Sequence, residues 1–290
     1  MACQKKQERS SKKLTIVCTT SMIADGIKNF TADSATVTAL MGEGVDPHLY
    51  KATTGDLERL YEADIVFYNG LHLEGKMTEI LEKLRRIKPV IAIATGIPAQ
   101  ELLVVDSASH TIDPHIWFDV KNWSHALNYA ATSLQNYDTL HSNYYAQNSK
   151  QYLLKLAKLD SLVEQNIQQI PTNQRLLITS HDAFSYFGKR YHIDVKGLQG
   201  ISTAADFGLK DISDLVKLII ARKIRAIFVE TSVSSKSIDA VLVGCKAKGH
   251  EVVIGGHLYT DAMGKNGTLE GTYIGMMQAN VRMITEGLKK

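Results

Sequence analysis

The stretch DTLHSNYYAQNSKQYLLKLAKLDSLVEQNIQQI, residues 138–170, decides how the rest of this 290-residue chain is organised. No glycine or proline occurs from His115 to its end. Its apolar side chains recur at helical spacing, at Leu140, Tyr144, Leu153, Leu156, Leu159, Leu162 and Ile167. We predict a single rigid helix, roughly 48 Å long at about 1.5 Å per residue, that links two lobes. The alternative is two shorter helices with a kink between them.

On both sides of this helix, short apolar strands alternate with amphipathic helices. Before it, strands are predicted at 14–20, 36–42, 65–70 and 89–96, with helices at 21–30, 53–64 and 73–86. After it, strands are predicted at 175–180, 194–200, 226–231 and 251–256, with helices at 207–223, 234–249 and 272–288. Such alternation predicts parallel sheets covered on both faces.

The predicted fold is therefore α/β, with two lobes that each contain a parallel four-stranded sheet flanked by helices. The expected division is a tether at 1–13, an N-terminal lobe at 14–137, the linking helix at 138–170 and a C-terminal lobe at 171–290. Residues 1–13 read MACQKKQERSSKK, a polar composition that predicts disorder. We find no signal-peptide apolar region and no apolar run of about 18 residues that would span a membrane.

Composition excludes some classes of partner and of covalent framework. A net charge of +3 gives no basic stripe, so we expect no nucleic-acid partner. The three cysteines, Cys3, Cys18 and Cys245, form no CxxC pair and no disulfide framework. Cys18 lies in an apolar strand and is predicted to be an inert buried thiol. Cys3 fits either an ordinary cytosolic start or the lipid-bearing first residue of a processed lipoprotein.

Histidines and acids gather where predicted strands end. GVDPHLY (44–50) and IDPHIWFDV (112–120) each place an Asp-Pro-His tripeptide in a loop, which brings His48 and His115 to such positions. His181 ends a third strand, and Asp261 lies just beyond a fourth. Ligands of open α/β sheets bind outside the carboxyl ends of strands, so these four residues are expected in a cleft between the lobes.

Three imidazoles and one carboxylate suit a divalent first-row metal ion. Four protein ligands form a closed set with little room for a catalytic water, which favours carriage over hydrolysis. Asp46 and Asp113 are predicted to orient imidazoles from behind. Glu230 ends a strand and would either approach the cleft or cap the next helix. Surface or packing roles are expected for the other histidines, His72, His110, His125, His141, His192, His250 and His257, and core positions for Trp117 and Trp123.

Several longer segments carry a resemblance to a known family. They are MGEGVDPHLYKATTGD (41–56), DIVFYNGLHLEGKM (64–77), DPHIWFDVKNWS (113–124), TSHDAFSYFG (179–188), VKGLQGISTA (195–204) and TDAMGKNGTLEGTYIGM (260–276). From about Leu14 to Leu288, the chain resembles the cluster A-I solute-binding proteins, the metal receptors of bacterial zinc and manganese ABC importers.

The resemblance implies two α/β lobes joined by one long helix, with one transported Zn²⁺ or Mn²⁺ ion between them. Carried over by position, its ligands are His48, His115, His181 and Asp261. The resemblance also implies a monomer that delivers its ion to an ABC permease, outside the cytoplasmic membrane, with a lipid anchor at Cys3. Manganese-dedicated members tend to have Glu where His181 stands. Zinc-dedicated members often carry a His-rich loop, whereas the interval 97–112 contains only His110.

We expect a binding protein and not an enzyme, but two other classes are compatible with the same residues. A metal-dependent hydrolase would need an open coordination position and a base such as Glu230 or Asp182. A surface adhesin would carry the metal site incidentally.

Overall fold

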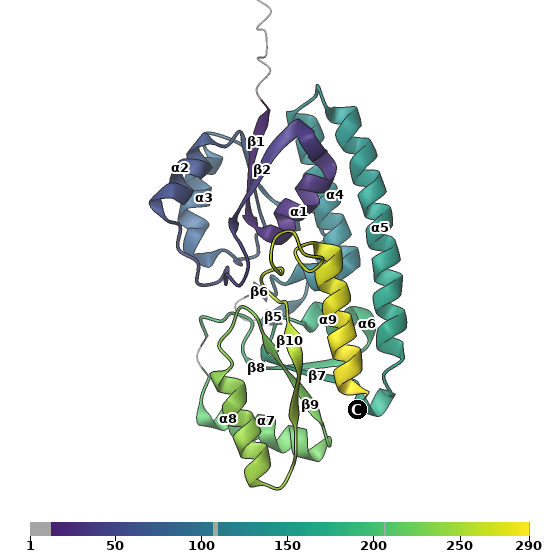
Figure 1. Cartoon of the computed structure of the whole chain (residues 1–290). Coiled ribbons are helices and arrows are strands. Elements are labelled where there is room, and N and C mark those ends of the chain that lie inside the picture. The colour runs from purple at the N-terminus through teal and green to yellow at the C-terminus, as the bar shows by residue number, and fades with distance from the viewer. Residues whose placement is uncertain (1–12, 107–109, 206, 290) are drawn as a thin grey trace, which may run out of the picture.

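A computed structural model describes residues 13–106, 110–205 and 207–289. Two α/β lobes lie one above the other, and helix α5 (Ser142–Gln168) runs beside both (Figure 1). The predicted α/β class is confirmed. Our boundaries between tether, lobes and linking helix remain a proposal. Residues 1–12 of the predicted tether, including Cys3, lie outside the described residues.

The N-terminal lobe is built on one continuous parallel sheet. Its strands are β1 (Leu14–Thr20), β2 (Ala35–Met41), β3 (Ile65–Tyr68) and β4 (Val90–Ala92), in the order β2-β1-β3-β4. Side chains of β1 alternate between two apolar clusters, because successive residues of a strand point to opposite faces. One cluster includes residues of α1 (Ser21–Thr31) and α4 (Val120–Tyr137), and the other includes residues of α2 (Thr54–Glu62) and α3 (Thr78–Arg85).

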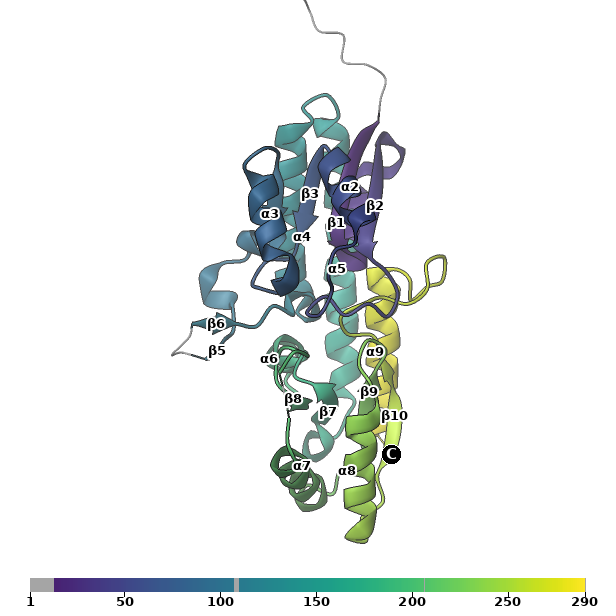
Figure 2. The same ribbon diagram turned by 90° about the vertical axis from the view of Figure 1, so that its left-hand side faces the viewer.

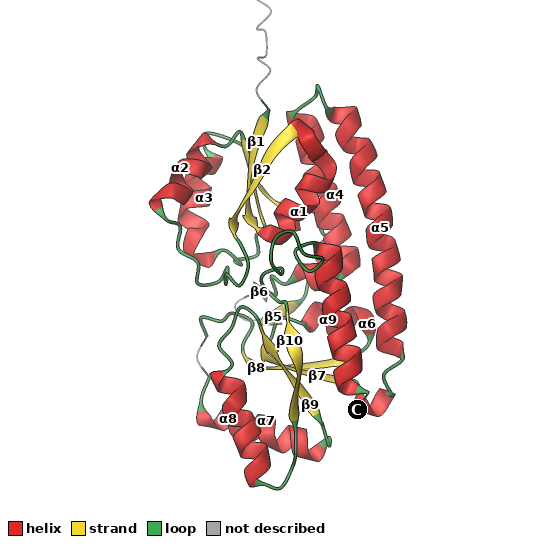
Figure 3. Ribbon diagram, viewed as in Figure 1, coloured by secondary structure: helices red, strands yellow, loops and turns green. Residues whose placement is uncertain are grey.

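The C-terminal lobe contains the four predicted strands, but they do not form one continuous sheet. Strand β7 (Leu176–His181) pairs with β8 (Asp194–Gln199), and β9 (Ala226–Glu230) pairs with β10 (Val253–Leu258). Both pairs are parallel, and β7 contacts β9. The prediction of a second four-stranded sheet is therefore wrong in its hydrogen bonding, although the strands lie together (Figure 3).

Helices cover this second set of strands as well. Helices α7 (Leu209–Ala221) and α8 (Lys236–Ala247) share one apolar cluster with the strands. On the other side, α9 (Tyr273–Leu288) contacts β10 and α5, so that α5 packs against elements of both lobes (Figure 2). No helix among the residues described is long and apolar enough to cross a bilayer.

The linking helix is one helix, but it starts later than predicted. Helix α4 ends at Tyr137, and the chain turns at Asp138, whose carboxylate accepts hydrogen bonds from His141 Nδ1 at 2.7 Å and from the Tyr145 hydroxyl at 2.8 Å. The predicted stripe is also displaced by one residue in places, because Tyr144 and Leu162 are exposed and their neighbours Tyr145 and Val163 are buried. Leu140 lies before the helix and is exposed. The buried stripe is Tyr145, Ser149, Tyr152, Leu156, Leu159, Val163 and Ile167.

The structure also contains short elements that differ from the predicted ones or add to them, and two of its 3₁₀ turns replace parts of the predicted helix 73–86 and the predicted strand 89–96. The short elements are the antiparallel pair β5 (Val104–Asp106) and β6 (Thr111–Ile112), the helix α6 (Ser185–Tyr191) and the 3₁₀ turns Ala32–Ser34, Gly75–Met77, Ile93–Gly96, Ala99–Glu101, Ile116–Phe118 and Thr172–Gln174. Their shortness leaves no apolar period to read. The cysteine prediction agrees with the structure: Cys18 is buried, and burial raises the pKa of its thiol.

Candidate metal centre

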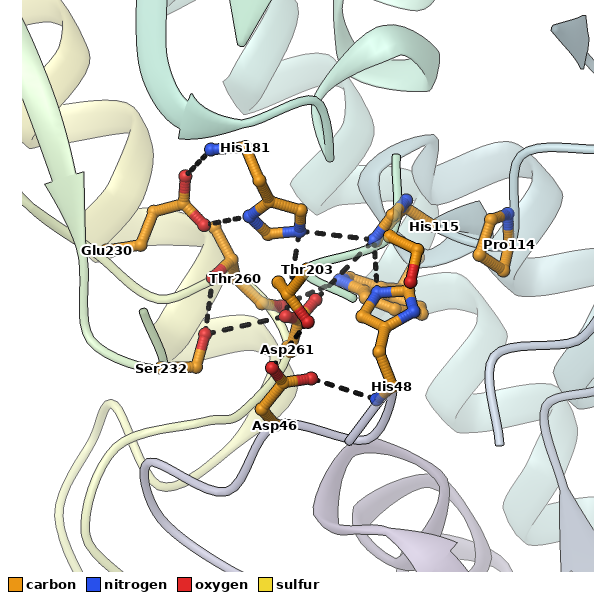
Figure 4. Close-up of polar contacts among 12 residues, drawn as sticks. Asp46, His48, Pro114, His115, His181, Thr203, Glu230, Ser232, Thr260 and Asp261 are labelled. Atoms are coloured by element: carbon orange, nitrogen blue, oxygen red, sulfur yellow. Dashed lines mark hydrogen bonds and ion pairs between the residues drawn. The ribbon is translucent and has the colours of Figure 1, made fainter. Parts of the chain in front are cut away.

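The structure brings all four predicted ligands together between the lobes. His48 lies in the loop after β2, and His115 lies directly before the turn that leads into α4. His181 is the last residue of β7, and Asp261 follows β10. Each side chain is buried, and one ligand atom from each lies within 4.8 Å of all the others (Figure 4). No other such cluster of three or more His, Cys, Asp or Glu occurs among the described residues.

The spacing of these atoms matches a small coordination sphere. His115 Nε2 lies 3.2 Å from His48 Nε2 and 3.4 Å from His181 Nε2. The Asp261 oxygens lie 3.6 Å from the Nε2 atoms of His115 and His181. Ligand atoms about 2.0–2.1 Å from a tetrahedral zinc ion are separated by about 3.4 Å. These four atom pairs therefore have about the separation expected between ligands of one such ion, and the remaining pairs lie within 4.8 Å.

Carboxylates hold two of the imidazoles from behind. Asp113 Oδ1 is 2.7 Å from His115 Nδ1 and also accepts the His115 backbone N–H at 2.9 Å. Glu230 contacts His181 Nδ1 in the same manner and accepts the His181 backbone N–H at 2.8 Å. A carboxylate on Nδ1 selects the tautomer that leaves Nε2 unprotonated and pointing into the cluster.

These contacts decide three of our expectations. The orienting role of Asp113 is seen, and Glu230 takes the cleft alternative by contacting His181. For Asp46 the prediction is wrong in detail, because its Oδ1 accepts the backbone N–H of His48 at 2.8 Å. Its other oxygen accepts a hydrogen bond from the Thr203 hydroxyl at 2.6 Å. None of the hydrogen bonds found among the described residues joins Asp46 to the His48 ring.

Burial sets the protonation of the centre. It lowers the pKa of His48 to about 3, with His115 contributing, and it holds the pKa of His115 well below its ordinary value. Burial also opposes the charge of His181, but Glu230 and Asp261 outweigh it and raise the His181 pKa to about 9. Burial raises the pKa of Asp261 to about 7, and Asp261 Oδ1 has no hydrogen-bond partner. A cation would supply the partner that this buried oxygen lacks.

Two buried aromatic residues join the lobes beside the cluster. Trp117 packs its ring edge-on against the His115 ring and donates a hydrogen bond from Nε1 to the carbonyl of Thr260 at 3.0 Å. Tyr186 donates its hydroxyl proton to the carbonyl of Asp113, also at 3.0 Å. Trp117 and Trp123 are buried as predicted, and Trp117 also contacts Thr260, the neighbour of the candidate ligand Asp261.

Two α/β lobes that enclose three imidazoles and a carboxylate define a bilobed binding protein with a cluster of candidate metal ligands between its lobes. A family model described as "Zinc-uptake complex component A periplasmic" matches residues 16–287. The chain belongs to this family.

Individual relatives agree with this assignment over almost the whole chain. The chain is 46% identical to "Manganese-binding lipoprotein MntA" of Bacillus subtilis over 280 residues, 97% of this chain and 91% of that protein. It is 44% identical to "Zinc-binding protein TroA" of Treponema pallidum over 278 residues, 96% of this chain and 90% of that protein. The solved structure of TroA matches with a TM-score of 0.94 at 43% identity, covering 96% of this chain and all of that one.

Proposed function

We propose that this protein captures one Zn²⁺ or Mn²⁺ ion outside the cytoplasmic membrane and delivers it to an ABC-type permease. The observation that carries the proposal is the buried set of ligand atoms on His48, His115, His181 and Asp261, which all lie within 4.8 Å of one another. We assign these four residues as the ligands. Relatives named as manganese-binding and zinc-binding proteins support both candidate ions.

The ligand set favours zinc on chemical grounds without rejecting manganese. Three imidazoles bind Zn²⁺ more strongly than Mn²⁺ by the general affinity order. Both oxygens of Asp261 face the imidazoles, which also suits a harder ion that takes more oxygen ligands. Because zinc has the higher general affinity, a purified sample will tend to hold zinc whichever ion is carried in the cell.

In this proposal the protein is not an enzyme. Four protein ligands complete a tetrahedral sphere, so no position remains for a water that a hydrolase would activate. Of the two bases considered, Glu230 is engaged by His181, and Asp182 accepts a hydrogen bond from the Ser185 hydroxyl at 3.1 Å. We also propose that the protein is a monomer and that a lipid on Cys3 holds it at the membrane. The lipoprotein names of relatives support the lipid anchor. Mass spectrometry of the protein extracted from membranes would test the lipid.

Metal binding to chelator-stripped protein tests the central proposal. We expect one equivalent of Zn²⁺ or Mn²⁺ to bind, measured by calorimetry and elemental analysis, and competition at buffered free-ion concentrations to rank the two ions. The bound ion should raise the unfolding temperature, because it binds the folded state alone. His257→Ala is the matched control, since His257 is exposed on β10. Failure of the stripped protein to take up either ion would refute the proposal.

A further inference from the structure

The lobes are joined around the cluster by polar contacts of two kinds. The hydrogen bonds from Trp117 to Thr260 and from Tyr186 to Asp113 connect buried residues. The hydrogen bond from Thr203 Oγ1 to Asp46 Oδ2 connects two half-buried side chains of loops that lie 157 residues apart in sequence. Breaking a buried hydrogen bond leaves groups without partners, whereas water can replace the partners at a half-buried one. The Asp46–Thr203 hydrogen bond is therefore easier to break than the two buried ones.

This contact is tied to a proposed ligand on the N-terminal side. Asp46 accepts the His48 backbone N–H with Oδ1 and the Thr203 hydroxyl with Oδ2 (Figure 4). One carboxylate thus fixes the loop of His48 within its own lobe and also reaches the other lobe. Gly44, two residues earlier, has a φ of +67°, a conformation that favours glycine and lets this loop turn sharply.

On the C-terminal side the contact is tied to a second proposed ligand. Gln199 is the register partner of His181 in the pairing of β7 with β8. Its side-chain amide donates a hydrogen bond to the Thr203 carbonyl at 2.7 Å and another to the Ala205 carbonyl. The loop that presents the Thr203 hydroxyl is thereby attached to the strand beside His181. A continuous set of contacts runs from the His48 backbone through Asp46, Thr203 and Gln199 to the strand pair of His181.

We propose that the Asp46–Thr203 hydrogen bond is a latch that holds the His48 loop against the C-terminal lobe over the bound ion and sets the rate at which the ion dissociates. Neither side chain is among the four ligands, so both are positioning residues for cargo retention. The inference rests on the proposed function. When the latch opens, the His48 loop can move away from the C-terminal lobe while the buried contacts of Trp117 and Tyr186 stay in place.

The test measures release of a preloaded ion. Protein loaded with Zn²⁺ is mixed with excess chromogenic chelator in a stopped-flow instrument, and the experiment is repeated with Mn²⁺. Thr203→Val removes the donor at nearly constant shape and should speed release about tenfold, because hydrogen bonds to charged groups are stronger than neutral ones. Thr203→Ser keeps the hydroxyl and should release at the parent rate. Thr132→Val is the control, since Thr132 donates only within α4.

A double-mutant cycle tests whether the two residues act as a pair. Asp46→Ala should speed release by itself, and adding Thr203→Val to it should cause no further increase. The latch is refuted if Thr203→Val releases the ion at the parent rate, if Thr203→Ser is as fast as Thr203→Val, or if the two effects multiply. A parent protein that binds neither ion would overturn the proposed function and the latch together, whereas the preceding outcomes overturn the latch alone.

Discussion

The two Asp-Pro-His loops have the same tripeptide but use it differently. In the second loop, Asp113 holds both the backbone and the ring of His115, and both residues are completely buried. In the first loop, Asp46 holds only the backbone of His48 and reaches Thr203 in the other lobe. His48 is not completely buried, because 6% of its surface remains accessible to solvent. The second loop thus presents a candidate ligand that is held by both backbone and ring, and the first presents a candidate ligand whose loop also contacts the opposite lobe.

The comparison shows that two copies of one tripeptide need not make the same contacts. Proline before each histidine restricts the backbone in both loops. What separates the loops is where the aspartate's second oxygen lies. Asp113 Oδ2 is buried without a hydrogen-bond partner, whereas Asp46 Oδ2 lies at the lobe interface and accepts from Thr203. Burial therefore makes one aspartate an orienting group for a ring, and partial exposure makes the other a contact between lobes.

The largest expected effect separates the two histidines themselves. His115→Ala should weaken Zn²⁺ binding by at least about a hundredfold, because about 10–16 kcal/mol of zinc affinity shared by four ligands is about 3 kcal/mol each. His48→Ala should weaken it less, since a water can enter on the less buried side and complete the sphere. Competition titration of both variants measures the difference.

Equal losses of Zn²⁺ affinity in His115→Ala and His48→Ala would contradict the distinction between a fixed and a movable ligand. His257→Ala, which changes an exposed histidine, controls for nonspecific effects on the affinity.

A smaller effect is expected from the two aspartates. Asp113→Ala should lower the equilibrium affinity by about 10–100-fold, as is typical when the carboxylate behind a metal-bound histidine is lost. Asp46→Ala should lower it less, because the His48 ring has no hydrogen bond to Asp46 to lose. Asp113→Asn keeps an acceptor for His115 Nδ1 and should retain more affinity than Asp113→Ala. An Asp46→Ala variant as weak as Asp113→Ala would contradict the comparison.

The sequence was sufficient to place the four candidate ligands. His48, His181 and Asp261 follow predicted strands, and parallel strands share one carboxyl edge. His115 was placed by the second Asp-Pro-His tripeptide, in a loop before a helix.

The sequence was not sufficient for Glu230. That residue ends β9, and its contact with His181 depends on β9 lying next to β7, which follows from packing and not from local pattern. Asp46 was misassigned for the same reason. Its partner Thr203 is distant in sequence, so the tripeptide alone pointed to the ring.

Two features of the fold escaped prediction for reasons of packing as well. The stripe on α5 was displaced because Tyr144 and Tyr145 are equally apolar neighbours, and only contact with the lobes decides which is buried. The C-terminal strands had the correct positions, but apolar runs do not reveal which neighbouring strands exchange hydrogen bonds. Element type was therefore readable from local pattern, whereas contacts between distant elements required the structure.

The smallest expected effect is proton release on metal binding. It compares the histidines of the two Asp-Pro-His loops with His181 of the C-terminal lobe. His48 and His115 have lowered pKa values and hold no proton at neutral pH, whereas the His181 pKa is raised to about 9. The ion requires neutral imidazoles, so binding at pH 8 should release about one proton, from His181. Affinity should then rise about tenfold per pH unit as pH approaches 9 from below, and level off above it.

Calorimetry in buffers of different ionisation enthalpy measures this release directly. At pH 8 the experiment lies above the Asp261 pKa of about 7, which limits the contribution of that carboxyl. Glu230→Gln keeps an acceptor for His181 but removes the charge that helps to raise its pKa, so proton release should fall. Release unchanged by Glu230→Gln would assign the proton to another group. If proton release persists in Glu230→Gln but is lost in His48→Ala, the proton comes from the His48 loop. That result would contradict the predicted difference in protonation between the two loops and His181.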